Sequence, residues 1–175
     1  MISTERLNIW PLEPQDLAKN YSWANDGGLC RLIGALPMPK PFREIEGWFS
    51  NVTADPETHV FSIKLKDGCH IGNAELRDLD LRCGACELGI MIGESRYRGQ
   101  GYGSEAVKGV CGFAFRQLRL HRIKVRVLQY NEPAFAMFKR CGFTLEGTER
   151  EAFWQDGRHW DIRIMSLLCS EFERK

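Results

Sequence analysis

The segment "RGQGYGS", from Arg98 to Ser104, concentrates glycines and hydrogen-bonding residues between two apolar stretches. Its glycines, Gly99, Gly101 and Gly103, have no side chains to keep a ligand away from the backbone. A glycine-rich turn that opens a helix points several N–H groups at one place, on the positive end of the helix dipole. Ser104 can cap this helix and Arg98 can add a fixed charge. This chemistry favours binding of an anion, most naturally a phosphate, although a plain glycine-rich connector remains an alternative.

The two common phosphate loops do not fit this segment. A Walker loop ends in Gly-Lys-Ser/Thr, whereas "GYGSEA" has no lysine at that place. A dinucleotide loop follows the first strand of an all-parallel unit, whereas this segment follows strands that should be antiparallel. The remaining interpretation is a pyrophosphate site on a mixed sheet.

Three strands are predicted before the segment. "HVFSIKL" (59–65) and "HIGNAELRDL" (70–79) alternate with a period of two, and the Asp67-Gly68 pair between them suits a tight hairpin turn. "CELGIMIG" (86–93) adds a third strand. Together they predict an antiparallel meander that ends at the glycine-rich segment.

A helix and a parallel strand should follow. "SEAVKGVCGFAFRQL" has one apolar face, and "HRIKVRVL" alternates like a half-buried strand. A helix crossover makes this strand parallel to the end of the meander. A first strand and two helices precede the meander, and a short helix capped by Asn131 and a final hairpin at Asp156-Gly157 follow the parallel strand. The order is therefore β-α-α-β-β-β-α-β-α-β-β. We expect an α/β (α+β) fold, a single domain over 1–175 with a mixed, mostly antiparallel seven-stranded sheet and about four helices.

Charge and composition argue against several classes of function. Lys and Arg number 24 and Asp and Glu number 23, so the net charge of +1 creates no field that attracts nucleic acid or a membrane surface. No window approaches the roughly 18 apolar residues that a membrane span requires. Glu5 and Arg6 interrupt the region where a signal peptide needs an apolar run. We expect a cytoplasmic protein with neither nucleic acid nor membrane as partner.

The seven cysteines are odd in number and scattered, unlike a disulfide framework. Cys83 and Cys86 form one CxxC motif, with Cys69 and His70 upstream, and a zinc site could be drawn from these four residues. Because no second CxxC or HxxxH is present, strand packing is favoured and we expect no metal.

"RGQGYG" resembles the Arg/Gln-x-x-Gly-x-Gly/Ala loop of the GNAT superfamily of acyl-CoA-dependent N-acetyltransferases. The similarity continues through "TERLNIWPLEPQDL", "ELGIMIGESRYRGQGYGSEAV", "LHRIKVRVLQYNEPAFAMFKRCGFTLEGTER" and "WDIRIMSLL". The pattern is closest to the bacterial ribosomal-protein N-terminal (Rim-type) and spermidine acetyltransferases. The resemblance implies transfer of acetyl from acetyl-CoA to a primary amine, which could belong to a protein N-terminus, a polyamine or a small molecule.

The resemblance also implies which residues hold coenzyme A. The pyrophosphate would lie against Arg98, Gly99, Gln100, Gly101, Tyr102, Gly103 and Ser104. The pantetheine arm would pair with the backbone of Ile90, Met91 and Ile92, where one N–H can face the thioester oxygen as negative charge builds on it. Asn131 would contact the same arm. Phe138 occupies the place where the family often has a tyrosine that protonates the leaving thiolate, and a phenyl ring cannot do this.

The reaction requires a proton acceptor because a protonated amine has no lone pair. Relatives often carry a glutamate at the position of Glu87, on the expected cofactor strand, which makes it the first candidate; a salt bridge or a solvent-facing position is the competing interpretation. Glu75 on the neighbouring strand is the second candidate. On the final hairpin, Asp161 could bind the charge of the amine and Trp154 could wall the acceptor pocket, although cross-strand packing explains Trp154 more simply.

A second function stays open at this point. Water, Cys141 or Tyr130 could replace the missing tyrosine, but Phe138 also fits a non-catalytic CoA-binding sensor or partner module. Glu87 and the otherwise complete motifs favour the enzyme. The acceptor should contact the loop "GGLCRLIGALPMPKP" (27–41) and the final hairpin, and a homodimer is possible.

Overall fold

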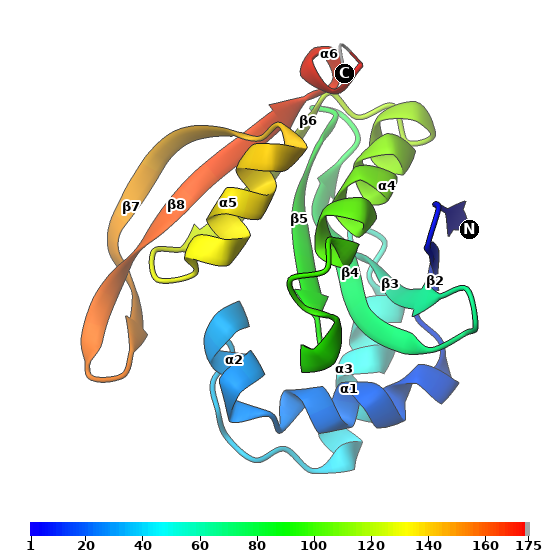
Figure 1. Cartoon of the computed structure of the whole chain (residues 1–175), viewed down its shortest axis with the longest axis vertical. Coiled ribbons are helices and arrows are strands. Elements are labelled where there is room, and N and C mark those ends of the chain that lie inside the picture. The colour runs from blue at the N-terminus through cyan, green and yellow to red at the C-terminus, as the bar shows by residue number, and fades with distance from the viewer. Residues whose placement is uncertain (174–175) are drawn as a thin grey trace.

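Eight strands form one mixed sheet in the order β1-β2-β3-β4-β5-β6-β8-β7 (Figure 1). The structure is a computed structural model that describes residues 1–173. The strands are β1 Ile2–Ser3, β2 Leu7–Pro11, β3 His59–Leu65, β4 His70–Asp80, β5 Ala85–Ile92, β6 Arg122–Leu128, β7 Thr144–Gln155 and β8 Arg158–Leu168. The helices are α1 Leu17–Ala24, α2 Gly27–Ile33, α3 Phe42–Ala54, α4 Tyr102–Arg116, α5 Glu132–Cys141 and α6 Cys169–Phe172, and 3-10 turns cover Pro14–Asp16 and Ser95–Tyr97.

The predicted class and topology are confirmed, with two differences in number. β3, β4 and β5 form the antiparallel meander, and β5 pairs with β6 in parallel. The sheet has eight strands instead of seven because Ile2–Ser3 pairs with β2 as a short edge strand. The helices exceed the expected four because α2 and α6 are added. α2 corrects the expectation that 27–41 is a loop throughout.

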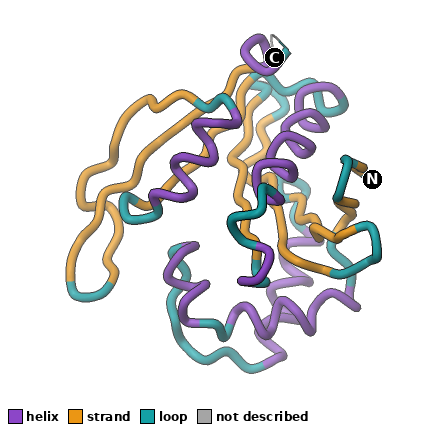
Figure 2. The backbone as a smooth tube through the Cα atoms, viewed as in Figure 1, coloured by secondary structure: helices purple, strands orange, loops and turns teal. Residues whose placement is uncertain are grey.

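Alternation along the strands gives the sheet two different faces. On one face Ala74, Leu76, Leu88 and Val125 are buried, and α4 packs against β1, β2, β4 and β5. Residues that alternate with these, such as Glu75, point to the opposite face. α1 packs against α2 and α3, and Figure 2 shows the three helices grouped at the end of the sheet away from α6.

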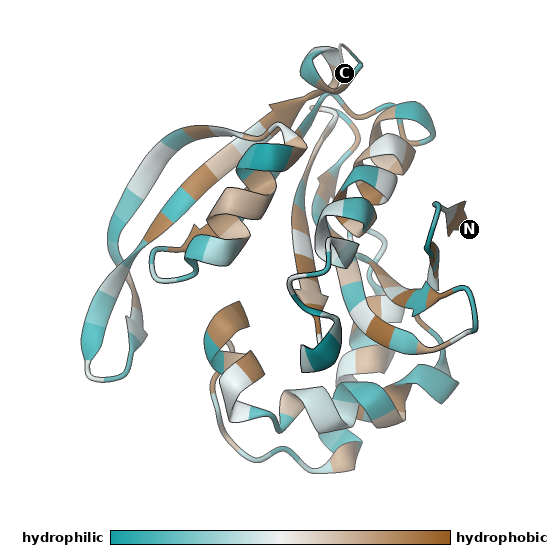
Figure 3. Ribbon diagram, in the orientation of Figure 1, coloured by the Kyte–Doolittle hydropathy of each residue, from teal (hydrophilic) through white to brown (hydrophobic). Residues whose placement is uncertain are grey.

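The β7–β8 hairpin forms the outer edge of the sheet and turns at Asp156-Gly157, as expected. Every residue of β7 from Thr144 to Ala152 is exposed. Figure 3 shows β7 mostly in hydrophilic to neutral colours, unlike the central strands. Its charged side chains disfavour pairing with another edge strand.

Candidate active site

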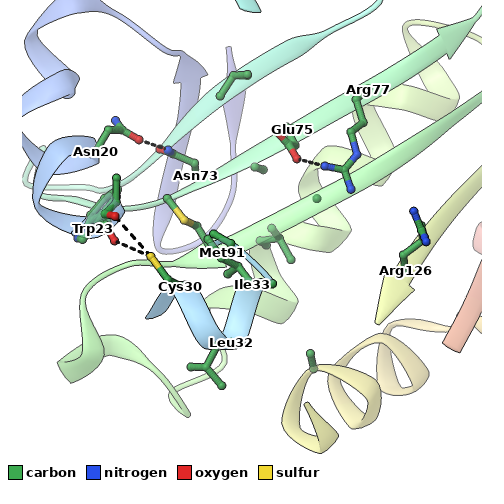
Figure 4. Close-up of a pocket in the computed structure, with 18 of the residues that line it drawn as sticks. Asn20, Trp23, Cys30, Leu32, Ile33, Asn73, Glu75, Arg77, Met91 and Arg126 are labelled. Carbon is green, nitrogen blue, oxygen red and sulfur yellow. Dashed lines mark hydrogen bonds and ion pairs between the residues drawn. The ribbon is translucent and has the colours of Figure 1, made fainter. Parts of the chain in front are cut away.

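A pocket opens where β5 and β6 separate. The two strands pair only over Ala85–Glu87 and Arg122–Lys124, and beyond these residues a cavity of about 510 Å³ lies between them. Its walls come from α1, α2, α3, β3, β4, β5, β6 and α5. Figure 4 shows Glu75 and Arg77 joined by an ion pair on one strand, with Arg126 on a separate strand. A splayed pair of parallel strands thus provides the opening in an otherwise continuous sheet.

The glycine-rich loop leads directly into α4. Gly99 and Gly101 have φ values of 75° and 84°, in the left-handed region that disfavours residues with a Cβ. α4 begins at Tyr102, and Gly101 is its N-cap without a side-chain hydrogen bond. The expectation that Ser104 caps this helix is therefore wrong, because Ser104 already lies inside the first turn. Glycine at the cap leaves the first N–H groups of α4 accessible to a ligand.

Arg98 and Gly103 have structural partners. The Arg98 Nε donates to the Ile92 carbonyl at 2.8 Å and its terminal NH2 donates to the Gly93 carbonyl at 2.7 Å. The guanidinium thus ties the end of β5 to the loop. A Cβ on Gly103 would lie 3.0 Å from the Met137 sulfur. This glycine therefore serves the close packing of α4 against α5.

Arg6, which the sequence pattern does not single out, holds the loop from the N-terminal side. Its Nε lies 2.6 Å from Glu105 Oε2, and one terminal nitrogen donates to the Gln100 carbonyl at 3.0 Å. The guanidinium also lies 4.3 Å from the centre of the Tyr102 ring. These contacts bridge nearly a hundred positions in the chain, and no local motif marks them.

The two candidate carboxylates lie on the same face of the sheet but in different surroundings. Glu75 pairs in register with Gly89, and its Oε1 would lie 2.5 Å from a Cβ on that glycine, so its carboxylate occupies the space over β5. It lines the pocket and lies 2.7 Å from Arg77. The Glu87 side chain is 4% exposed, pairs with Arg77 and lies 3.4 Å from Lys124 Nζ. Glu87 is not among the described residues that line the pocket.

The surroundings of Glu75 change its acidity. Burial raises the pKa of its carboxyl group above the ordinary value, and the Arg77 guanidinium offsets only part of this effect, while the Glu87 charge adds to it. A carboxylate with a raised pKa is a stronger base than an exposed one. Glu75 therefore combines access to the pocket with the acid–base character that proton transfer requires.

α5 contributes Asn131 and Phe138 to the pocket wall. The Asn131 side chain caps α5 by accepting from the Ala134 N–H at 3.2 Å, as predicted, and its amide donates to the Leu32 carbonyl at 2.9 Å. Phe138 is buried and packs edge-on against Phe143, with ring centres 5.2 Å apart. The Asn131 contact joins α2 to α5 across the opening.

The possible substitutes for a tyrosine acid point elsewhere. The Tyr130 hydroxyl donates to the Arg31 carbonyl at 2.7 Å, and the Cys141 thiol faces the Ser104 carbonyl at 3.8 Å. Neither belongs to the described residues that line the pocket. A proton for a leaving thiolate would come from solvent or from the acceptor.

The two hairpin residues lie outside the pocket lining. The Asp161 carboxylate accepts from the Glu151 N–H at 2.8 Å, where the β7–β8 register shifts. Trp154 is 60% exposed and stacks edge-on against His159 at 4.8 Å. In this arrangement, Asp161 stabilises the irregular part of β7, and Trp154 packs across the hairpin.

Two features are absent from residues 1–173. No helix there is both long enough and apolar enough to cross a membrane. No group of three or more His, Cys, Asp or Glu side chains lies close enough to hold a metal ion. Cys83 is exposed, whereas Cys86 is buried, and burial raises the pKa of its thiol to about 12.

Known proteins share this architecture and sequence pattern. A family model described as an acetyltransferase (GNAT) domain matches residues 6–144. The spermidine N(1)-acetyltransferase of Vibrio cholerae is 27% identical over 167 residues, covering 95% of each chain. A putative ribosomal N-acetyltransferase of Bacillus subtilis is 32% identical over 109 residues, covering 62% of this chain and 59% of the relative.

A solved structure agrees closely with the fold. The crystal structure of spermidine N-acetyltransferase from Vibrio cholerae in complex with CoA and spermine superposes with a TM-score of 0.91 at 25% identity. The match covers 97% of this chain and 99% of that one. Because the family model spans most of the chain and the Vibrio cholerae relative covers 95% of it, this chain belongs to the GNAT acetyltransferases.

Proposed function

We propose that this protein transfers an acetyl group from acetyl-CoA to a small primary amine, with Glu75 as the proton acceptor. The observation that carries the assignment is the position of Glu75. Its carboxylate lines the pocket, lies over Gly89 on β5 and has a raised pKa. This proposal prefers Glu75 to Glu87, whose carboxylate is committed to Arg77 and Lys124.

The separated strands and the glycine-rich loop suit coenzyme A. Beyond Glu87, β5 has no ladder partner on β6, so Ile90, Met91 and Ile92 can offer backbone groups to the pantetheine arm. The N–H groups at the start of α4 would receive the pyrophosphate. Gly101 as the N-cap leaves room for this approach.

Acetyl-CoA supplies an activated acetyl group, whose C–S bond breaks as the new C–N bond forms. Glu75 takes a proton from the bound ammonium, which frees the lone pair of the amine for attack on the thioester carbon. A backbone N–H of β5 stabilises the negative charge on the carbonyl oxygen. The second proton on nitrogen is lost to solvent as the amide forms. Because a thiol is far more acidic than an alcohol, the thiolate can leave near neutral pH without a tyrosine acid.

Activity with acetyl-CoA and a panel of amines tests this function. Turnover should be measured by mass spectrometry of the acetylated amine, because the exposed Cys83 thiol would react with reagents that detect free CoA. We expect turnover of at least one monoamine. Binding of acetyl-CoA without turnover of any polyamine, monoamine or peptide N-terminus would contradict the proposal.

A non-catalytic CoA-binding module is a second candidate function, because Phe138 stands where the family often has a tyrosine acid and a phenyl ring cannot donate a proton. Phe138→Tyr separates the two functions. If thiolate departure needs no acid, the variant should change kcat less than about threefold, since departure of a good leaving group gains little from general acid catalysis. A wild-type protein without turnover that gains it in Phe138→Tyr would support the module. The panel of amines and acetyl-CoA stays the same in both measurements.

Gly101→Ala should weaken CoA binding about tenfold. The φ of 84° places alanine in the left-handed region, at a cost of roughly 1–2 kcal/mol. A change of the loop backbone that relieves this strain would turn its N–H groups away from the pyrophosphate position. Calorimetric titration with CoA measures the change. Gly112→Ala in the interior of α4 is the matched control, because a Cβ there makes only ordinary contacts and binding should not change.

The relatives differ in the acceptors that their names state. The Vibrio cholerae structure contains spermine, and a related structure of that enzyme is described as dodecameric. Spermidine is therefore included in the panel of amines. A homodimer of this chain stays a prediction.

A further inference from the structure

The charged side chains that line the pocket do not form an acidic site. The cations are Lys40, Arg77 and Arg126, and the carboxylates are Glu44 and Glu75. Arg77 pairs with Glu75 at 2.7 Å, and Arg126 pairs with a carboxylate outside the lining at 2.6 Å. Among the described lining residues, Glu44 alone is a carboxylate without an arginine partner, and it lies in the first turn of α3, where the helix dipole offsets its charge.

A polycation would find few partners in this pocket. Each ammonium group removed from water needs a carboxylate or carbonyl partner to offset its desolvation. The Glu75 carboxylate can be the partner of the ammonium group that reacts. Additional ammonium groups would find Arg77 and Arg126 already paired with carboxylates and would approach the unpaired Lys40, and like charges at close range raise the free energy of binding. The charge balance therefore opposes a polyamine acceptor.

Lys40 is a cation whose charge no carboxylate within residues 1–173 neutralises by an ion pair. Its backbone is fixed on both sides by Asn25, because the Lys40 N–H donates to Asn25 Oδ1 at 2.8 Å and the Lys40 carbonyl accepts from Asn25 Nδ2 at 3.1 Å. The base of the side chain is thus anchored at the pocket wall while its ammonium group is uncommitted. Such a cation is suited to an anionic group on a ligand.

Apart from Asn20, the remaining walls are mainly apolar on the side formed by the N-terminal helices and β3. They carry two tryptophans and three aliphatic side chains, Trp23, Trp48, Ile33, Ile45 and Val60. Apolar and aromatic walls with a few placed polar groups are typical of sites for small molecules with a hydrophobic body. A flexible polyamine chain would gain less from these walls than a compact apolar group.

We propose that the acceptor is a monoamine with an apolar body and one anionic group, and that Lys40 binds this anionic group. The inference rests on the proposed function, because it places the reacting amine at Glu75. The apolar body lies against the tryptophan side of the pocket, and the anion, a carboxylate or a phosphate, reaches Lys40. Repulsion by the Lys40 ammonium group rejects acceptors with a second cation.

Three acceptors with the same aromatic body test the inference. They are 4-(aminomethyl)benzoate, 4-methylbenzylamine and 1,4-bis(aminomethyl)benzene, which carry a negative, neutral or positive group opposite the amine. We expect kcat/KM to fall in this order, with about tenfold between the first and the last. Spermidine, as a fourth acceptor, should rank with the diamine. The corresponding aminomethyl-phenyl phosphate distinguishes carboxylate from phosphate as the preferred anion.

Lys40→Glu should reverse the order of the negative and positive acceptors. Lys108→Glu is the matched control, because Lys108 is exposed on α4 outside the described lining and the same charge change there should keep the wild-type order. Binding of each acceptor in the presence of CoA is measured in parallel by tryptophan fluorescence, since Trp23 and Trp48 line the pocket.

The two readouts separate this inference from the proposed function. Absence of turnover for all acceptors contradicts the proposed function, while the order of binding still tests the role of Lys40. A wild-type preference for the diamine or spermidine, in turnover or in binding, overturns the inference. An order that Lys40→Glu leaves unchanged also overturns it.

Discussion

Glu75→Gln should lower kcat by about 100-fold, with little change in the KM for acetyl-CoA. General base catalysis contributes roughly 10²–10⁴-fold to a rate, and glutamine keeps the shape of the side chain while losing its basicity. The carboxylate lies over Gly89 and lines the pocket, so its loss acts at the reacting amine. Steady-state kinetics with a reactive amine measures both parameters.

The pH dependence provides a second signature. Burial raises the pKa of Glu75 above its ordinary value, and the base must be deprotonated to act, so kcat/KM should rise with pH through this raised pKa. Glu75→Gln should lose this limb of the profile, whereas the limb that belongs to the acceptor amine remains.

Glu87→Gln is the matched control for the proton acceptor. Both carboxylates contact Arg77, but Glu87 is buried and paired with Lys124 outside the described pocket lining. Glu87→Gln should therefore act mainly on the free energy of unfolding, with only a small effect on kcat. A large loss of kcat with disappearance of the acidic limb in Glu87→Gln, and near-normal kinetics in Glu75→Gln, would assign the role to Glu87.

Local sequence patterns predict most of the strands in the sheet. In "HVFSIKL" the apolar Phe61, Ile63 and Leu65 alternate with the polar Ser62 and Lys64, and β3 spans the predicted residues 59–65. Local residues also predict both ends of α5. Asn131 caps its N-terminus, and Gly142 ends the helix in the left-handed conformation. These features depend on side chains within a few residues of one another, so one segment contains the whole signal.

The sequence pattern does not predict α2, because the stability of this helix is not local. Two glycines open the helix and lower its intrinsic propensity. Asp26 caps it by accepting from the Gly28 and Leu29 N–H groups, and Asn131 contacts its last turn from about a hundred residues away. The cap could have been recognised from the sequence, but the tertiary contact could not.

The preference for one glutamate over the other also depends on tertiary structure. Both glutamates lie on strands that the sequence predicts, and both face the same side of the sheet. Pairing of Glu75 with Gly89 places one carboxylate over a residue without a side chain, while pairing of Glu87 with Arg77 places the other against a cation. Register between strands decides these neighbours, and a shift by one residue would replace both of them with residues that now face the other side of the sheet.

Asp16→Asn should lower the free energy of unfolding by about 3 kcal/mol, because removal of one partner from a buried ion pair leaves the other partner uncompensated. The Asp16 side chain is 4% exposed and lies 2.7 Å from Lys64 Nζ. It also accepts from the Ser62 hydroxyl at 2.5 Å, so it joins the turn before α1 to β3. Urea denaturation at neutral pH measures the loss.

The same substitution should change how stability depends on pH. Burial alone would raise the pKa of Asp16, but hydrogen bonds from Lys64 and Ser62 outweigh it and hold the pKa below the ordinary value of 3.8. The wild-type stabilisation is therefore fully present above the unfolded pKa and is lost as pH falls through the lower folded pKa. The difference between wild type and Asp16→Asn should shrink in acid.

Asp78→Asn is the control for this buried pair. Asp78 is 70% exposed and lies 3.8 Å from Lys124, a surface pair whose loss should cost about 0.5 kcal/mol or less. Asparagine also tolerates the left-handed backbone that Asp78 adopts, with a φ of 51°. Equal losses of stability in the two variants would show that the Asp16–Lys64 pair does not supply the stabilisation, and so would a difference for Asp16→Asn that persists below the folded pKa. The two variants should differ because Asp16→Asn leaves the partly buried Lys64 ammonium without its ion-pair partner, whereas Asp78→Asn removes a pair at the surface.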